Sequence, residues 1–459
     1  MTQTPAGTNA LLNDPPLRTM FRLGLPTMVV IMAQIAVSII ETYWTSRIGR
    51  DALAGVTLVA PLVALMATMS NGGIGGGVSS AIARALGAGD QAKANRLLWH
   101  AVVIAVGFGV FFTNILLAFG PLLYTALGGE GTVLQQALIY STWVFGGSIP
   151  FWMMNLLSSA MRGSGDVKLP AAVSLAGTVI IIPLSPALIF GWGPLPHMGV
   201  AGAGASVLIF YIGATLYFWK ALAKGRGALK LQPTKLDAGS FGAILGVGLV
   251  SAMGTIVTNL TTVMVTGAVG LAGAAALAGY GVASRIDFLL IPMLFGFATA
   301  VVSVVGMAVG AGKPERAREA AWKAAATAFV FTQSVGILAA VFPQTWMGFF
   351  SSDPAVIKAG ADYLRIAAPA YGAFGIGLML YFASQGLGKM GWPLAAGVVR
   401  LVLASSLAWF LATKLSGTVG PAYGILAGSI AFGAINAFGF WRVSRIKPRP
   451  EAVSGSAQA

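Results

Sequence analysis

The stretch GAGDQAKANRLLWHA, residues Gly87–Ala101, recurs 223 residues later as GAGKPERAREAAWKA, residues Gly310–Ala324. Both stretches begin with Gly-Ala-Gly, carry basic residues downstream and keep a tryptophan at the same position. A second pair of loops, GSGDVKLPAA from Gly163 and GLGKMGWPLA from Gly386, matches at the same spacing. Matched loops at a constant offset indicate a duplicated unit. The sequence therefore predicts two copies of one fold.

The composition places this duplicated unit in a membrane. Of the 459 residues, 57% are hydrophobic and only 9% are charged, whereas soluble domains carry about 25% charged residues. The mean hydropathy is +0.82. Uncharged runs such as 97–127 exceed the roughly 20 residues that cross a bilayer as a helix. The chain has no cysteine and two histidines, which excludes thiolate chemistry and argues against a metal cluster, so we expect no cofactor.

Breaks between the apolar runs predict an all-α polytopic membrane protein with twelve transmembrane helices in two pseudo-symmetric six-helix bundles. The expected spans are 20–46, 52–83, 97–120, 133–160, 169–190, 199–222, 241–267, 274–309, 321–342, 355–385, 392–413 and 420–442. The expected domains are an N-terminal tail (1–17), a first bundle (18–223), a linker (224–240), a second bundle (241–446) and a C-terminal tail (447–459). Because six spans is an even number, both copies share one orientation, as in parallel transporter repeats.

The basic residues predict which side of the membrane is inside. Of the 28 lysines and arginines, 21 fall in the tails and loops on one predicted side and four on the other. The remaining three, Arg285, Arg365 and Arg400, lie within spans. By the positive-inside rule, both termini and the linker are cytoplasmic. The net charge of +15 is thus explained by topology and by contact with anionic lipids, and we expect no nucleic-acid partner.

Polar side chains form a stripe on the first helix of each copy. At helical spacing, one face of the first helix carries Thr27, Gln34, Ser38, Glu41 and Thr45. One face of the seventh carries Ser251, Thr255, either Thr258 or Asn259, Thr262 and Thr266. Polar stripes on spanning helices face protein or a water-filled cavity rather than lipid. We take Gln34, Ser38, Thr45, Asn259 and Thr262 as cavity-lining candidates. Only the first stripe contains an acid, Glu41.

Intramembrane charges are the candidates for coupling. Glu41 can gain and lose a proton or exchange it for a cation; its alternative role is a carboxyl satisfied by a hydrogen bond or reaching the outer surface. Asp287 is the second candidate ion or proton site. Arg285, two residues away and on another helix face, is a possible partner of a carboxylate across the cleft, with a structural network as the alternative. We interpret Arg400 as structural, with its charge reaching toward the cytoplasm.

The pattern GLPTMVV…ETYWTSRIGRDALAG, followed by ARALGAGDQAKANR and AMRGSGDVKLP, resembles the MATE family of multidrug and toxic compound extrusion transporters. The resemblance extends over nearly all of the chain between the tails. It implies twelve helices in two bundles and export of amphipathic, often cationic compounds driven by H⁺ or Na⁺. Many bacterial members have an aspartate where this chain has Glu41. The helix-5 segment IIPLSPALIFG departs from the family pattern, because Ser185 replaces the usual aspartate and Ile181 the usual asparagine. Ser185 remains a cavity-lining candidate.

These observations predict a non-enzymatic secondary antiporter, acting as a monomer in the bacterial inner membrane and exporting small amphipathic compounds in exchange for H⁺ or Na⁺. Membrane lipids are its other partners. The alternative is a flippase for a lipid-linked or amphipathic lipid substrate, whose cavity should be rich in arginine and lysine. A receptor or scaffold would not need a duplicated bundle with an intramembrane acid. No Walker motif is present, which argues against ATP as the energy source.

Overall fold

A computed structural model of the chain describes residues 12–225 and 227–445, so most of the N-terminal tail and the whole C-terminal tail lie outside the described residues. The structure is 86% helical, and its described residues contain no β-strand. The first half comprises α2 (Pro16–Ser46), α3 (Arg50–Thr68), η1 (Met69–Ile74), α4 (Gly75–Gly87), α5 (Gln91–Ala126), α6 (Gly131–Gly146), α7 (Ser148–Gly163), α8 (Lys168–Phe190) and α9 (Val200–Ala223).

The second half repeats this order of long helices. It comprises α10 (Ala238–Gly270), α11 (Ala274–Ala283), α12 (Arg285–Gly310), α13 (Pro314–Val341), α14 (Pro343–Gly348), α15 (Pro354–Ala367), η2 (Ala368–Ala370), α16 (Tyr371–Leu387), α17 (Gly391–Ala412) and α18 (Val419–Ser444). Helical segments occupy all twelve expected spans, and most differ from them by a few residues at their ends. The predicted fold class is confirmed.

The expected span 133–160 is interrupted at Gly147, between α6 and α7, much as 274–309 is interrupted at Ser284, between α11 and α12. Pro150, in the first turn of α7, has no N–H to donate to the carbonyl of Gly146, so a continuous helix would lose a hydrogen bond there. Helices α6 and α7 have 16 residues each. Eleven helical stretches of the described residues are therefore long and apolar enough to cross a membrane by themselves, and α6 with α7 occupies the place of the twelfth.

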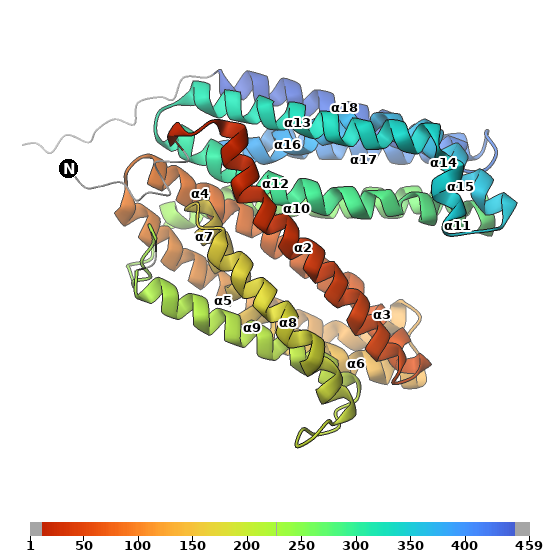
Figure 1. Cartoon of the computed structure of the whole chain (residues 1–459), viewed down its shortest axis with the longest axis horizontal. Coiled ribbons are helices and arrows are strands. Elements are labelled where there is room, and N and C mark those ends of the chain that lie inside the picture. Colours follow the sequence, from red (N-terminus) through yellow and green to blue (C-terminus); the bar gives the residue numbers. More distant parts are fainter. Residues whose placement is uncertain (1–11, 226, 446–459) are drawn as a thin grey trace, which may run out of the picture.

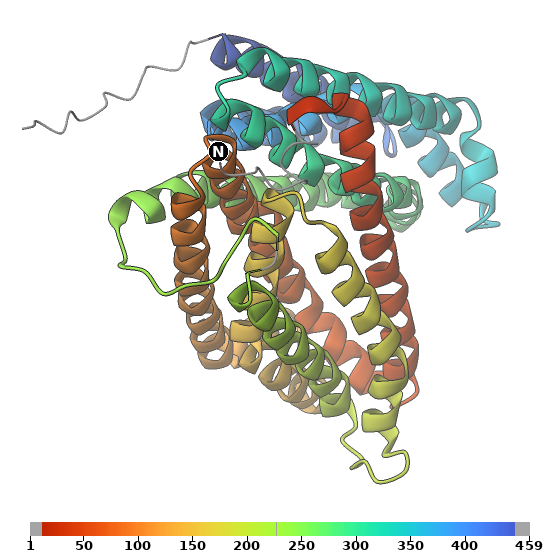
Figure 2. The same ribbon diagram turned by 60° about the vertical axis from the view of Figure 1, so that its left-hand side comes forward.

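The two halves form two bundles that are close together at one end and further apart at the other (Figure 1). Helices α4 and α12 meet at the close end, whereas α3 and α6 of one bundle lie well away from α11, α14 and α15 of the other (Figure 1). In Figure 2 the second half, in green to blue, lies across the top of the first half, and α2 runs from one to the other. The loops that join α4 to α5 and α12 to α13 share the close end.

Hydrogen bonds between the bundles obey the symmetry of the repeat. The Ser80 hydroxyl of α4 donates to the carbonyl of Gln385 in α16. The Ser303 hydroxyl of α12 donates to the carbonyl of Arg162 in α7 at 2.9 Å. Residues 80 and 303, like residues 162 and 385, are related by the 223-residue offset of the sequence repeat. One contact is therefore made twice, once from each bundle.

Glycines allow the backbones to approach at this interface, again in symmetric pairs. A side chain at Gly87 would meet the carbonyl oxygen of Met307, and a side chain at Gly310 would meet the carbonyl oxygen of Arg84. These positions match under the same offset, which explains why the Gly-Ala-Gly loops begin with glycine in both copies. The duplicated sequence thus produces a two-fold interface at the close end.

Buried polar groups at the same interface find partners across it. The Arg84 guanidinium donates to the carbonyl of Gly386 at 3.2 Å. The Gln385 amide nitrogen donates across the interface to the carbonyl of Gly72 at 2.9 Å, and within its own bundle to the Ser251 hydroxyl at 2.8 Å. Buried polar groups are costly unless they are hydrogen-bonded, so separating the bundles here requires water to replace these partners. The close end is therefore a closed gate in this structure.

The segment expected to be a linker, 224–240, is docked onto the first bundle. The Gln91 amide donates to the carbonyl of Ala228 at 2.5 Å, and the backbone N–H of Lys230 donates to Asn95 Oδ1 at 2.9 Å. Leu229 and Leu231 are buried. The second bundle therefore begins from a segment that is anchored on α5 and α9.

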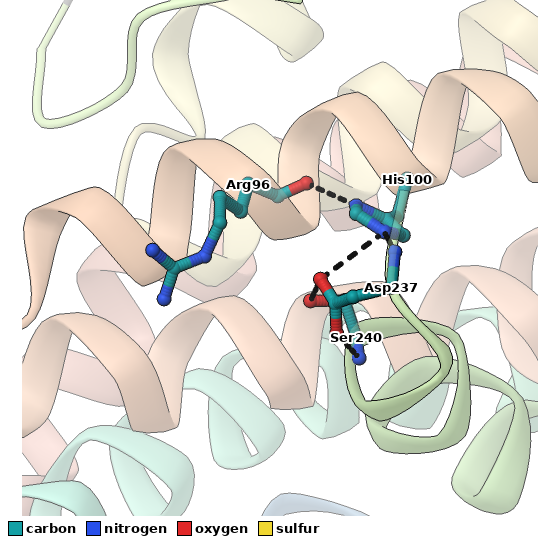
Figure 3. Close-up of polar contacts among 4 residues, drawn as sticks. All are labelled: Arg96, His100, Asp237 and Ser240. Carbon is teal, nitrogen blue, oxygen red and sulfur yellow. Dashed lines mark hydrogen bonds and ion pairs between the residues drawn. The ribbon is translucent and has the colours of Figure 1, made fainter. Parts of the chain in front are cut away.

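A histidine completes this anchor (Figure 3). The backbone N–H of Asp237 donates to His100 Nε2 at 2.9 Å, and His100 Nδ1 lies 2.7 Å from the carbonyl oxygen of Arg96. This arrangement fits a neutral ring that carries its proton on Nδ1. Asp237 caps α10 by accepting from the Ser240 backbone N–H at 2.7 Å and from its hydroxyl at 2.8 Å. His100 is thus a buried residue that joins the linker to α5.

Replacing Asp237 by alanine should lower the midpoint of thermal unfolding. The hydrogen bonds from the Ser240 backbone and side chain hold the pKa of Asp237 below its ordinary value. A depressed folded-state pKa means that the stabilisation is present above the unfolded pKa, about 3.9 for aspartate, and is lost as the pH falls through the folded value. We therefore expect a full difference from wild type at pH 7 that fades in acid. Asp237→Asn should retain the cap, and equal midpoints for the wild type and the alanine variant at pH 7 would contradict the cap.

Candidate functional site

Glu41, near the end of α2, is half-buried, and one of its two carboxylate oxygens is buried without a hydrogen-bond partner. Its Oε1 atom has no partner among the described residues. Tyr140 of α6 and Tyr211 of α9 lie close enough to interact with it electrostatically. An ionised carboxylate in such surroundings is costly unless a proton or a cation accompanies it. Oε1 thus lacks the hydrogen bond that one alternative role for Glu41 requires, and the other alternative, a carboxyl that reaches the outer surface, stays open beside the coupling role.

Trp44, one helical turn after Glu41, closes this region on one side. Its ring packs edge-on against Phe190 at 6.0 Å and Trp192 at 6.3 Å between centroids, which brings the ends of α2 and α8 together. Its indole nitrogen and the hydroxyl of Ser185 on α8 are further buried polar atoms without a partner. Helices α2 and α8, which pack against each other, therefore carry three of the buried unpartnered polar groups in the described part of the first bundle.

The remaining candidates of the first stripe do not share one environment. The Thr45 side chain is buried, and its hydroxyl donates to the carbonyl of Glu41 at 2.8 Å within α2. Gln34 and Ser38 are exposed on α2. The Thr45 hydroxyl proton is therefore used within α2 and cannot be donated to a ligand. The exposed side chains of Gln34 and Ser38 remain free to contact one.

The second bundle contains a cavity of about 600 Å³. Its walls come from α10, α11, α12, α15, α16, α17 and α18, with Thr332 from α13. Its polar lining residues are Thr258, Thr261, Thr262, Thr266, Tyr280, Ser284, Asp287, Thr332, Tyr363, Tyr371, Arg400 and Ser429. Pockets for small molecules commonly measure about 300–1,000 Å³ and combine apolar walls with a few convergent polar groups. This cavity has that character.

Asp287 and Arg400 both line this cavity, and they interact electrostatically. We expected the Arg400 side chain to reach toward the cytoplasm, and this is wrong. Its guanidinium instead lies inside the bundle, 4.8 Å from the centroid of the Phe374 ring. Cation–π attraction and the surrounding helices keep it there. The sequence singled out Arg400 because it lies within a predicted span. Only the packing of α17 against its neighbours shows which way the side chain points.

Two other candidates of the second bundle lie outside the cavity. Arg285 is exposed at the start of α12, and its guanidinium lies over the ring of Phe350 at 5.0 Å. It therefore does not take the place predicted for it beside an acid in the cleft. Asn259 is exposed on α10, and its amide donates to the carbonyl of Thr255 at 2.9 Å. Of the predicted stripe on α10, Thr258, Thr262 and Thr266 line the cavity, whereas Asn259 does not.

The two bundles place related tyrosines near their acids. Tyr140, near Glu41, matches Tyr363, near Asp287, under the 223-residue offset. The acids themselves are not matched, because Glu41 sits on the first helix of its copy and Asp287 on the second. Each bundle therefore holds one carboxylate in the same tyrosine-lined layer, reached from different helices. The sequence match of the tyrosines was the signal that could have located this layer.

Comparisons with known proteins agree with this architecture. The model of the MatE family matches residues 26–187 and 250–410, one segment in each half of the chain. A Shewanella oneidensis protein named FAD transporter is 24% identical over 405 residues, covering 86% of this chain and 88% of that protein. A Thermotoga maritima protein named probable multidrug resistance protein NorM is 28% identical over 350 residues, covering 74% of each chain.

Solved structures show the same fold. A structure described as MATE in the bent conformation superposes with a TM-score of 0.89 at 24% identity, covering 96% of this chain and 98% of that one. An outward-facing multidrug resistance MATE transporter gives a TM-score of 0.88, covering 97% and 100%. The described residues thus form a two-bundle helical membrane protein, with Glu41 in the first bundle and Asp287 in the second as its candidate coupling acids. The chain belongs to the MatE family.

Proposed function

We propose that this protein is a secondary antiporter that exports small amphipathic, mainly cationic compounds in exchange for H⁺ or Na⁺. Family membership supports it, as do the names of the relatives from Thermotoga maritima and Deinococcus radiodurans, both called probable multidrug resistance protein NorM. The observation that carries the proposal is the buried Glu41 carboxylate oxygen without a partner. A carboxylate in that position binds a coupling ion because the ion supplies the partner that the protein withholds.

Alternating access follows from the two-fold interface. The symmetric contacts of Ser80 and Ser303 close one end of the molecule, and the bundles are further apart at the other end. Rocking the bundles would exchange which end is closed, as in other transporters built from parallel repeats. Binding of H⁺ or Na⁺ at Glu41 shifts this equilibrium only to the extent that the two states bind the ion with different affinity. Asp287 is the second candidate for ion coupling.

Imposed ion gradients test the proposal. Proteoliposomes loaded with a fluorescent organic cation receive either a pH gradient or a Na⁺ gradient, each with the other ion balanced. We expect one gradient to drive transport of the cation and the other to have little effect. The name of the Shewanella relative adds a second substrate class, and FAD added to the same assay tests it. Transport that ignores both gradients would contradict the antiporter.

The alternative, a flippase for a lipid-linked substrate, is less well supported. A cavity that accepts a sugar–phosphate head group needs several basic residues to balance the phosphates. The cavity of the second bundle is lined by one arginine, Arg400, and by Asp287 with the opposite charge. A fluorescent lipid that is scrambled or flipped faster than in protein-free vesicles would favour the flippase.

The orientation of the protein has a direct test, because the chain has no cysteine of its own. We expect single cysteines replacing Lys235 or Lys313 to be labelled by a membrane-impermeant maleimide only after the inner face is opened. Single cysteines replacing Glu130 or Ser352 should be labelled in intact cells. All four residues are exposed. We expect this pattern because 21 of the basic residues lie on the predicted inner side and four on the outer side. The opposite labelling pattern would overturn the predicted topology.

A further inference from the structure

The guanidinium of Arg400 is an anion-binding group without an anion in direct contact. Its Nε atom is buried and has no hydrogen-bond partner. In the described part of the chain, no carboxylate oxygen lies within the 4.0 Å of an ion pair with this guanidinium. Asp287 is near enough to balance its charge but does not pair with it directly. A buried charge in this state is expected to bind a counter-ion when one can enter.

Aromatic rings fix the orientation of this guanidinium. It lies over Phe374 at 4.8 Å and Phe432 at 5.7 Å from the ring centroids. Because a guanidinium is planar and always charged, holding its plane leaves the edge free for the two parallel hydrogen bonds that a carboxylate accepts. Lysine could not reproduce this fork, since its ammonium group is a point charge on a flexible stem.

The rest of the cavity suits a flat ring. Tyr280 and Tyr363 meet edge-to-face at 5.1 Å between centroids, and both line the cavity with Tyr371 and Phe374. The buried Tyr371 hydroxyl lies beside the Asp287 carboxyl and interacts with it, so a ligand carboxylate near Arg400 competes with Asp287 for this donor as well. Offset and edge-to-face packing against such rings favours planar aromatic ligands. The volume of about 600 Å³ accommodates one.

We propose that the cavity of the second bundle binds planar aromatic compounds that carry a carboxylate, with Arg400 as the anion-binding residue and Asp287 as the competing counter-ion. This extends the substrates of the proposed antiporter beyond cations, and the binding step does not depend on ion coupling. The ionisable groups that line the cavity are Asp287, Arg400, Tyr280, Tyr363 and Tyr371. A ligand carboxylate that contacts Arg400 directly takes over from Asp287 the role of balancing the charge of the guanidinium.

Calorimetric titration of the purified full-length protein in lipid nanodiscs tests this assignment. The probes are 2-naphthoate, its uncharged methyl ester and 2-naphthylmethylammonium, which share one ring system. We expect wild-type protein to bind naphthoate at least tenfold more tightly than the ester. Arg400→Gln should lose that preference, and Arg400→Lys should keep only part of it. Arg365→Gln, which removes an exposed arginine of α15 outside the cavity, should change nothing.

Asp287→Asn tests whether Asp287 competes with the ligand carboxylate for Arg400. Because it removes the competing negative charge, it should tighten naphthoate severalfold and weaken the ammonium probe. Equal affinity for acid and ester, or unchanged naphthoate binding in Arg400→Gln with the fold verified by thermal melting, would overturn the proposal. Weaker naphthoate binding in Asp287→Asn would overturn the role of Asp287. Arg400-dependent naphthoate binding by a protein that shows no gradient-driven transport would sustain this site while contradicting the antiporter.

Discussion

Leucine at position 77 should lower gradient-driven efflux at least fivefold, whereas leucine at position 246 should leave it within about twofold of wild type. A side chain at Gly77 of α4 would meet the carbonyl oxygen of Ile244 and lie 2.8 Å from the backbone nitrogen of Gly248 across the closed interface. Nothing lies within 4 Å of a side chain built at Gly246, which lies between these two residues on α10. Both variants place leucine in a spanning helix, and only one obstructs the gate.

The magnitude follows from the cost of overpacking. Inserting side-chain volume into a closely packed interface costs roughly 1–3 kcal/mol, and backbone atoms cannot move aside as a flexible side chain can. At tenfold per 1.4 kcal/mol, that range disfavours the state closed at this end by a factor of about 5 to 150. The other conformation does not need this contact. Gly77→Leu should therefore fold and insert but spend most of its time in the wrong state for the cycle.

Spin labels can report the shift directly. Because the chain has no cysteine, labels can be placed on Glu130→Cys and Ser352→Cys, exposed positions in the loops before α6 and α15 at the end where the bundles are further apart. In Gly77→Leu the distribution of distances between them should move to shorter values, since opening one end closes the other. An unchanged distribution together with unchanged efflux would mean that the interface does not act as a gate.

The repeat in the sequence predicted more of the fold than the composition did. Composition and uncharged runs indicate helices that cross a membrane, but they do not say how the helices pair. The matched loops beginning at Gly87 and Gly310 predict two bundles in one orientation, and the structure places both glycines against the opposite bundle. The break at Gly147 was missed, because a proline within an apolar run can also be tolerated in a kinked helix.

The candidate site was predicted in part. A lone acid in a polar stripe identified Glu41, since an intramembrane carboxylate is costly whichever way it points. The cavity of the second bundle was not predicted, because it is enclosed by helices far apart in the sequence. Arg285 and Arg400 illustrate the difficulty: both lie in apolar stretches, yet one rests on Phe350 outside the cavity and the other lines it. The spacing of residues along a helix shows which of them share a face, but only the packing of the helices shows which residues surround that face.

Glu41→Gln should abolish coupling between the ion gradient and export. Glutamine has nearly the same shape as the protonated acid but can neither release a proton nor hold a cation by charge. Moving one elementary charge across a 100 mV potential supplies about 2.3 kcal/mol, which biases a two-state equilibrium roughly fifty-fold. Loss of the titrating group removes that bias, so substrate binding should persist while uphill transport stops. Glu41→Asp should keep part of the activity, since the carboxylate remains.

The measurement that tests this account most directly is gradient-driven transport of a fluorescent organic cation in proteoliposomes by wild type, Glu41→Gln and Glu130→Gln at matched protein content. Glu130 lies in an exposed loop at the start of α6, so its substitution removes a glutamate charge without touching the site. We expect wild type and Glu130→Gln to transport at similar rates in response to the effective ion. Glu41→Gln should fall to the level of protein-free vesicles while its thermal unfolding and substrate binding stay close to wild type. A Glu41→Gln protein that transports at the wild-type rate would contradict the role of Glu41 in coupling.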